Sequence, residues 1–284
     1  MAEAPKAAVP GGRAGEALGR ALLVYVLLAW TWVRAAAQYP VSMILLTTGT
    51  LFVTCLDLAA IALIFVHTPR LAGFSGAEVL FLYGTSVVSF AIADILLGSA
   101  ERLGQHVREG TLDAILVRPV SPLIQIATED FSPRRLGKLI PALVVLALAT
   151  RRVHVTWTTG RVIMIPVMLL SGVAIFGALW VLTTALQFVV IDAREAMNSV
   201  TYGGGFLTQY PLSVFGRDFV RTLTFLVPLA FVNWQPSLYI LDRPDPLGLP
   251  AALRFGSPLV AVLLCAVAAL AWRAGLRRYR STGS

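Results

Sequence analysis

The chain contains several apolar runs of about twenty residues, separated by short polar segments. A helix needs roughly 20 apolar residues to cross the ~30 Å hydrocarbon core of a bilayer, so each of these runs could span it. Only 13% of the residues are charged and 57% are hydrophobic, whereas about a quarter of a soluble domain is usually charged. The pattern therefore predicts an all-α polytopic membrane protein.

We expect six transmembrane helices preceded by an N-terminal interfacial helix. Residues 20–39 are apolar but include Trp30 and Trp32, and tryptophan favours the headgroup level, so we expect a helix along the interface. A true first span is the alternative, and Pro40 marks a break after it. The expected spans are 42–66, 78–99, 136–156, 162–190, an uncertain fifth within 196–233, and 256–272.

Two assignments remain open for the fifth span. In the first, a glycine-containing span at 196–216 is followed by outer, partly re-entrant helices, whose broken backbone needs surrounding protein or a wet cavity. In the second, residues 190–216 lie at the interface and 217–233 form the span. Pro228 and Pro236 interrupt the apolar stretch in either assignment.

The arginines predict the orientation of the chain. The polar interval 101–138 has more basic than acidic side chains and the C-terminal end is arginine-rich, which places both on the cytoplasmic side. Six spans then put both termini in the cytoplasm, in the plasma (cell inner) membrane. Arg151, Arg152 and His154 would lie outside and count against this topology, although arginines at a helix end can snorkel to the interface.

The rest of the chain is expected to form one permease domain, 20–280, after a mobile cytoplasmic tail at 1–19. The tail lacks the short apolar core and cleavage site of a signal peptide. The net charge of +8 is interpreted as the topology signal rather than as a surface for nucleic acid, because the arginines lie beside apolar runs.

The motifs of several enzyme classes are missing from the sequence. There is no G-x-x-x-x-G-K-[ST] loop to hold phosphates and no H-E-x-x-H, and His67, His106 and His154 are scattered. Cys55 and Cys265 lie in apolar runs without metal-site spacing. We therefore expect a non-catalytic chain with no catalytic, cofactor-binding or metal site, whose transport energy comes from another chain or an ion gradient.

Two carboxylates, Asp57 and Asp94, fall inside expected spans. An intramembrane carboxylate is costly and suggests a functional site, such as a proton or cation relay. The alternative is a structural role, hydrogen-bonded within the bundle. The structural interpretation is favoured for Asp94, which lies about two turns before Glu101, and Asp57 stays open.

The segment 107–123 predicts a short amphipathic helix that ends at a proline. Two faces are expected, with Leu112, Ile115 and Leu116 on one and Glu109 and Asp113 on the other. Such a helix could dock into a groove of a partner or pack on its own bundle, and periodicity does not decide between them.

A pattern in this segment resembles the six-helix permease family of bacterial type 2 ABC exporters. The loop pattern is Arg108-x-Gly110-x-Leu112-Asp113-x-x-Leu116-x-Arg118-Pro119, followed downstream by Tyr210-Pro211-Leu212, Arg221, Pro228 and Pro236. The resemblance extends from about residue 20 to Tyr279.

The resemblance implies that residues 101–122 within the coupling-helix loop 101–135 include the coupling helix, which sits in a cleft of a separate ATPase that binds ATP and Mg²⁺. It favours the first assignment of the fifth span. The implied ATPase-coupling residues are Arg108, Glu109, Gly110, Leu112, Asp113, Leu116, Arg118 and Pro119. The candidate pathway or relay residues are Asp57, Asp94, Tyr210 and Pro211.

We therefore expect a permease subunit of an ATP-binding cassette exporter, paired with a second permease, identical or paralogous, and with two ATPase subunits. One alternative is an ion-coupled secondary transporter that uses the intramembrane carboxylates, and another is a membrane scaffold. Aromatic and small residues at Tyr83, Tyr202, Gly203–Gly205 and Phe206 could suit an amphiphilic cargo, although core packing explains them as well.

Overall fold

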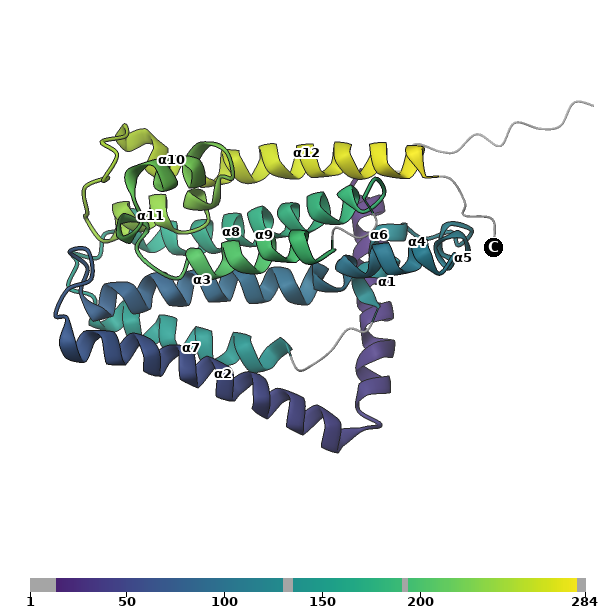
Figure 1. Ribbon diagram of the computed structural model, residues 1–284, viewed down its shortest axis with the longest axis horizontal. Coiled ribbons are helices and arrows are strands. Elements are labelled where there is room, and N and C mark those ends of the chain that lie inside the picture. Colours follow the sequence, from purple (N-terminus) through teal and green to yellow (C-terminus); the bar gives the residue numbers. More distant parts are fainter. Residues whose placement is uncertain (1–13, 130–134, 191–193, 280–284) are drawn as a thin grey trace, which may run out of the picture.

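The computed structural model describes residues 14–129, 135–190 and 194–279, and these residues form helices joined by turns. Six helices run side by side along the long axis (Figure 1). They are α2 (Pro40–His67), α3 (Gly76–Leu97), α7 (Leu136–Arg152), α8 (Thr159–Leu186), α9 (Arg194–Leu207) and α12 (Ser257–Arg278).

Short helices gather at the two opposite ends of this bundle (Figure 1). At one end, called the α5 end below, lie α4 (Leu103–Arg108), α5 (Leu112–Leu116) and α6 (Pro122–Thr128). At the other, called the α11 end, lie α10 (Arg217–Phe225) and α11 (Trp234–Ile240). These two groups of short helices are thus separated by the length of the bundle.

The predicted all-α polytopic membrane fold is confirmed. In the described part of the chain, five helical segments are long and apolar enough to cross a membrane, or six if the bent pair α10–α11 counts as one span. The helix α7 ends at Arg152 and its 17 residues rise about 25 Å, so it is shorter than the expected 136–156. The helix α12 instead continues beyond the expected 272 to Arg278.

The first helix, α1 (Ala14–Ala36), runs across the direction of the other long helices and packs on α6 (Figure 1). The hydroxyl of Tyr25 fixes this crossing by donating to the carbonyl of Leu96 at 2.9 Å. Trp30 is 58% exposed, as an interfacial tryptophan can be. By length and composition alone α1 also qualifies as a span, so both interpretations of 20–39 stay open. Residues 1–13 of the expected tail lie outside the described part of the chain.

The central helix of the bundle is α3, which packs on α7, α8 and α9 and is buried along most of its length. Gly84 allows the close contact with α7, because a Cβ atom there would meet the backbone of Leu146 at 2.9 Å. Buried hydrogen bonds add to the packing: the Asn233 side chain donates to the carbonyls of Leu82 and Thr208, each at 2.9 Å. In hydrocarbon such polar groups need internal partners.

The structure leaves both assignments of the uncertain fifth span open: α9 is shorter than the helices that qualify as spans, and the bent pair after it could be a broken span or a re-entrant loop. The helix α9 lies along α3 and α8, and its 14 residues rise about 21 Å. At the α11 end the chain then turns through α10 and α11, which meet at an angle of 79°. Pro228 precedes the turn between them and Pro236 lies in the first turn of α11.

Candidate functional site

The predicted coupling segment folds as three short helices at the α5 end. The helix α4 ends at Arg108, and Gly110 makes the turn into α5 with a φ of +69°, a conformation that favours glycine. The helix α5 has only five residues, and Pro119 precedes the start of α6. The motif residues thus surround one tight turn and a short projecting helix.

The inner side of this segment packs on the bundle. Leu112 is fully buried, as is Leu103 of α4, and both pack in an apolar cluster with α8 and α12. The remaining buried members of this cluster are Val107, Ile126, Ala178, Val181, Ala185, Ala268 and Trp272. This cluster links α5 to two of the long helices.

The outer side of the segment is open to solvent. Val117 is 85% exposed and Leu116 is 38% exposed, and Arg118 and Pro119 are exposed beside them. The predicted apolar face is divided, because Leu112 packs inward while Leu116 remains available to a partner. Packing on its own bundle is thus observed for Leu112, and docking to a partner stays a prediction for Leu116.

The acidic residue of α5, Asp113, faces its own chain. Burial raises the pKa of the Tyr279 phenol, which follows α12, and the nearby Asp113 carboxylate raises it further. The Tyr279 ring lies 6.2 Å from that of Phe188. Asp113 therefore lies near the residue that follows α12.

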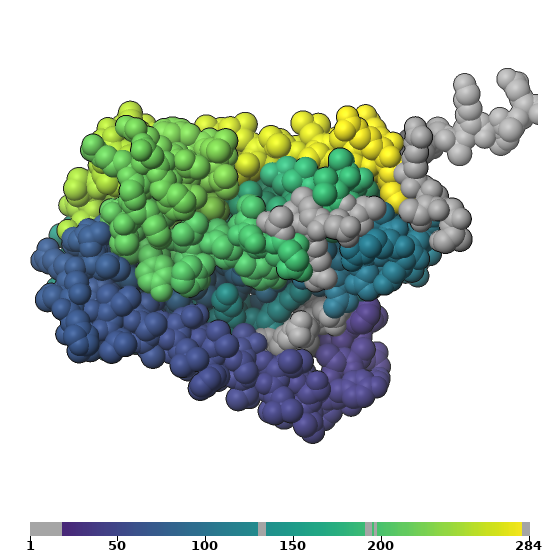
Figure 2. Space-filling model, viewed as in Figure 1, coloured from purple at the N-terminus to yellow at the C-terminus, as the bar shows by residue number. Residues whose placement is uncertain are grey.

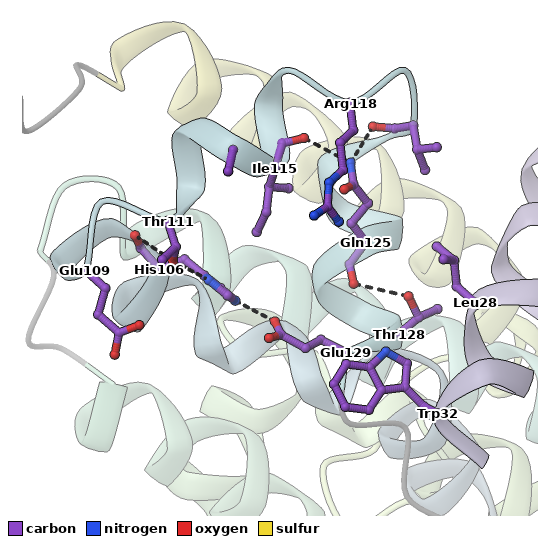
Figure 3. Close-up of a pocket in the computed structure, with 12 residues that line it drawn as sticks. Leu28, Trp32, His106, Glu109, Thr111, Ile115, Arg118, Gln125, Thr128 and Glu129 are labelled. Carbon is purple, nitrogen blue, oxygen red and sulfur yellow. Dashed lines mark hydrogen bonds and ion pairs between the residues drawn. The ribbon is translucent and has the colours of Figure 1, made fainter. Parts of the chain in front are cut away.

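A cavity of about 540 Å³ lies between α1 and the three short helices (Figure 3). His106 crosses its base: Nε2 lies 2.5 Å from Oε2 of Glu129, and Nδ1 lies 2.8 Å from the Thr111 hydroxyl. Trp32 closes the cavity from α1, and Glu109 also lines it. The Glu109 carboxylate accepts a hydrogen bond from the Gln105 amide at 2.8 Å.

Gln125 supports the exposed turn from inside this cavity (Figure 3). Its side-chain amide donates to the carbonyls of Ile115 at 3.0 Å and Val120 at 2.9 Å, on either side of Arg118. Gln125 and Glu129 were not predictable from the sequence, because their partners lie 5 to 23 residues away and no periodicity joins them. In the sequence, only the five-residue spacing between His106 and Thr111 could have indicated that these two side chains meet.

The candidate pathway residues come from different elements of the bundle. Asp57 is partly buried on α2, close enough to Tyr83 and Tyr210 to act on them electrostatically. Pro211 is buried after α9, where it precedes a 3-10 turn. Asp94, in contrast, lies in the last turn of α3, towards the α5 end.

Asp94 is held by Arg135 from the start of α7. The Nε atom of Arg135 lies 3.6 Å from Oδ1 of Asp94, and one guanidinium nitrogen donates to the Asp94 carbonyl at 2.9 Å. The other donates to the hydroxyl of Ser99 at 3.2 Å. These contacts are those expected of the structural role for Asp94.

The aromatic residues on α9 contribute to a ring cluster. Tyr202 packs 5.6 Å from Phe90 and 5.8 Å from Trp180, yet it is 41% exposed. Tyr83 is fully buried, and Phe206 is 54% exposed. Packing thus accounts for Tyr83, while α9 presents two aromatic rings on its outer surface.

At the α11 end the structure contains an ion pair that the sequence did not predict. Arg243 donates to both carboxylate oxygens of Glu78, each at 2.9 Å. Glu78 also caps α3 together with Ser75, whose amide donates to it at 2.7 Å. The capping pair can be recognised in the sequence as S-x-x-E before an apolar run, but its distant arginine partner cannot.

The bundle and its packed loop define a multi-pass membrane protein. Among the described residues, no group of three or more His, Cys, Asp or Glu side chains could hold a metal ion. A family model described as "ABC-2 family transporter protein" matches residues 51–283. The chain belongs to this family and is a permease component of an ABC transporter, as predicted. No curated protein and no solved structure matched the chain.

Proposed function

We propose that this chain forms the substrate pathway of an exporter driven by separate ATPase subunits, and that α5 is its coupling helix. One observation carries the proposal: α5 is buried on one side by Leu112 and exposed on the other at Leu116 and Val117. An element of this kind can bind a partner and transmit its movement. Membership of the family supports an ABC ATPase as that partner.

The apolar cluster beneath α5 supports a route for the movement. ATP binding would draw the two ATPase subunits together and displace the exposed turn at Val117. Because Leu112 and Leu103 pack with residues of α8 and α12, these helices would shift with it. Transport would follow as an alternation between inward and outward openings of paired permeases. ATP and Mg²⁺ would bind on the ATPase.

A second permease, identical or paralogous, would complete the pathway. The centre of the bundle is filled by α3, whose side chains Phe81, Leu82 and Tyr83 are fully buried. A pathway between two copies is therefore easier to build than one through a single copy. On α2, most of the apolar surface is exposed, as expected for contact with lipid or a second subunit.

The proposed orientation places the α5 end in the cytoplasm, with both termini on that side of the plasma membrane. The basic residues at the end of α12, Arg277 and Arg278, support this orientation through the positive-inside rule. Export is the proposed direction of transport, as the resemblance of the loop motif implies.

The test is purification of the tagged protein from its native membrane with its ATPase. Val117→Asp should release the ATPase or abolish its coupling, because a charge would replace an apolar side chain at the contact. Phe255→Asp is the matched control. Phe255 is also an exposed apolar residue (52%), but it lies on a 3-10 helix that packs on α11, at the opposite end of the bundle. Equal ATPase recovery and transport with both variants, or transport driven by an ion gradient without any ATPase, would contradict the proposal.

A further inference from the structure

A small polar pocket of about 180 Å³ lies inside the bundle, towards the α5 end. Its lining residues come from four long helices and the polar segments next to them: Thr50, Asp94, Glu101, Arg135, Lys138 and Tyr202. In Figure 2 the surface is hollowed between α9 (green) and α2 (blue to purple). Drug-sized ligands usually occupy about 300–1,000 Å³, so this pocket has room for a headgroup only.

Most charges in the pocket have partners. Asp94 pairs with Arg135 at 3.6 Å, and Glu101 accepts a hydrogen bond from the Tyr202 hydroxyl at 3.5 Å. These contacts neutralise one cation and engage one carboxylate of the lining. The remaining cation of the pocket is Lys138.

The ammonium group of Lys138 has a different environment. It lies 4.7 Å from the centre of the Phe90 ring, and in the described part of the chain no carboxylate is within ion-pair distance of it. Asp94 and Asp57 are near enough to attract it without pairing. A partly buried ammonium in a membrane protein is costly unless a counter-charge compensates it. Lys138 is therefore the group in this pocket that could bind an anion.

The surroundings of the pocket are apolar and exposed. Leu46 and Val53 share the face of α2 that carries Thr50, and they are 45% and 56% exposed. On α9, Phe206 follows Tyr202 by one turn and is 54% exposed. A molecule with its head at Lys138 would thus extend an apolar tail along α2 and α9 into the lipid.

We propose that this pocket binds the anionic headgroup, a carboxylate or a phosphate, of an amphiphilic molecule, with Lys138 as its ion-pair partner. The amphiphile is the cargo if the proposed function is correct, and the inference rests on that function only for this role. Binding itself requires neither the ATPase nor a second permease, so the two proposals can fail separately.

The test measures thermal unfolding of the purified chain in dodecyl maltoside with added dodecyl phosphate. Dodecyl phosphate should stabilise the protein, whereas dodecyl trimethylammonium should not. Lys138→Gln should raise the half-saturating concentration at least tenfold, and Lys138→Arg should restore most of the effect. Arg151→Gln is the control, because it removes an exposed cation from the other end of the same helix.

The outcomes separate the sources of the anion. Equal stabilisation by inorganic phosphate would show a site for a free anion and overturn the amphiphile. An unchanged response in Lys138→Gln would overturn the site. Should Lys138→Gln fail to fold, Thr50→Trp fills the pocket from the lipid-facing helix α2 and should abolish the response to dodecyl phosphate. A full response in that variant would also overturn the proposal.

Discussion

Arg243 and Glu78 are 165 positions apart in the sequence, and they form a two-pronged ion pair with both hydrogen bonds at 2.9 Å. The pair joins the segment after α11 to the first turn of α3. The Glu78 side chain is 10% exposed and that of Arg243 is 29% exposed, so the pair is largely shielded from water. Arg243 also lies over the Phe74 ring.

We expect Arg243→Ala to destabilise the protein by about 2 to 3 kcal/mol, somewhat below the ~3–5 kcal/mol of a fully buried pair that loses one partner. Arg243→Lys should recover only part of this loss, because an ammonium cannot make the same two-pronged contact. Thermal unfolding in detergent is the measurement. Arg221→Ala, which breaks the exposed pair with Asp218, should leave stability unchanged. Equal losses at the two arginines would contradict this prediction.

The two leucines of α5 should separate stability from coupling. Leu112→Ala removes a fully buried side chain, and we expect a loss of about 2–5 kcal/mol. Leu116→Ala should change stability little but reduce the transport-coupled ATPase activity of the purified complex, because Leu116 is available to a partner. Unfolding and ATPase assays on both variants test this. A coupling defect in Leu116→Ala that is matched by an equal loss of stability would count against a partner surface.

The contact between Asp113 and Tyr279 predicts a dependence on pH. Burial and Asp113 raise the pKa of Tyr279 in the folded protein above its ordinary value of 10.0. A raised pKa means that the neutral phenol stabilises the fold below pH 10.0 and that this contribution is lost as the pH rises through the folded-state pKa. Tyr279→Phe should therefore decline less steeply in stability between pH 9 and 11, as measured by unfolding. Tyr39→Phe, at an exposed tyrosine, should decline as the parent does.

The close contact of α3 and α7 can be tested with two glycines. Gly84→Ala should destabilise by about 1–3 kcal/mol, because the new Cβ would lie 2.9 Å from the backbone of Leu146. Gly49→Ala, in the middle of α2, has nothing within 4 Å, and we expect a gain of about 0.5–1 kcal/mol there. Both values come from unfolding in the same detergent. A stabilised Gly84→Ala variant would show that the helices can separate without cost.

The long helices were predictable because a helix that crosses the bilayer needs some twenty apolar residues, and hydropathy detects such runs directly. The end of α7 was not, since the apolar residues Val153 and Val155 continue the pattern after the helix has ended at Arg152. The segment after α9 stayed ambiguous because apolarity does not distinguish a straight span from a bent pair.

The candidate site was predictable as a motif but not as a surface. Periodicity places Leu112 and Leu116 on one face of α5, yet the first is buried in an apolar cluster with residues of α8 and α12 and the second is exposed. The pocket around Lys138 left no signal, because its lining comes from segments between residues 50 and 202. Only the folded chain brings them together.

The central helix α3 is attached at both of its ends. Glu78 in its first turn is bound by Arg243, and Asp94 in its last turn is bound by Arg135. A helix fixed in this way offers a stationary origin for spectroscopic distance measurements. Probes on α2, α9 or α12 that are paired with a probe on α3 would report the displacement of each outer helix by itself, and such measurements could rank the order in which they move.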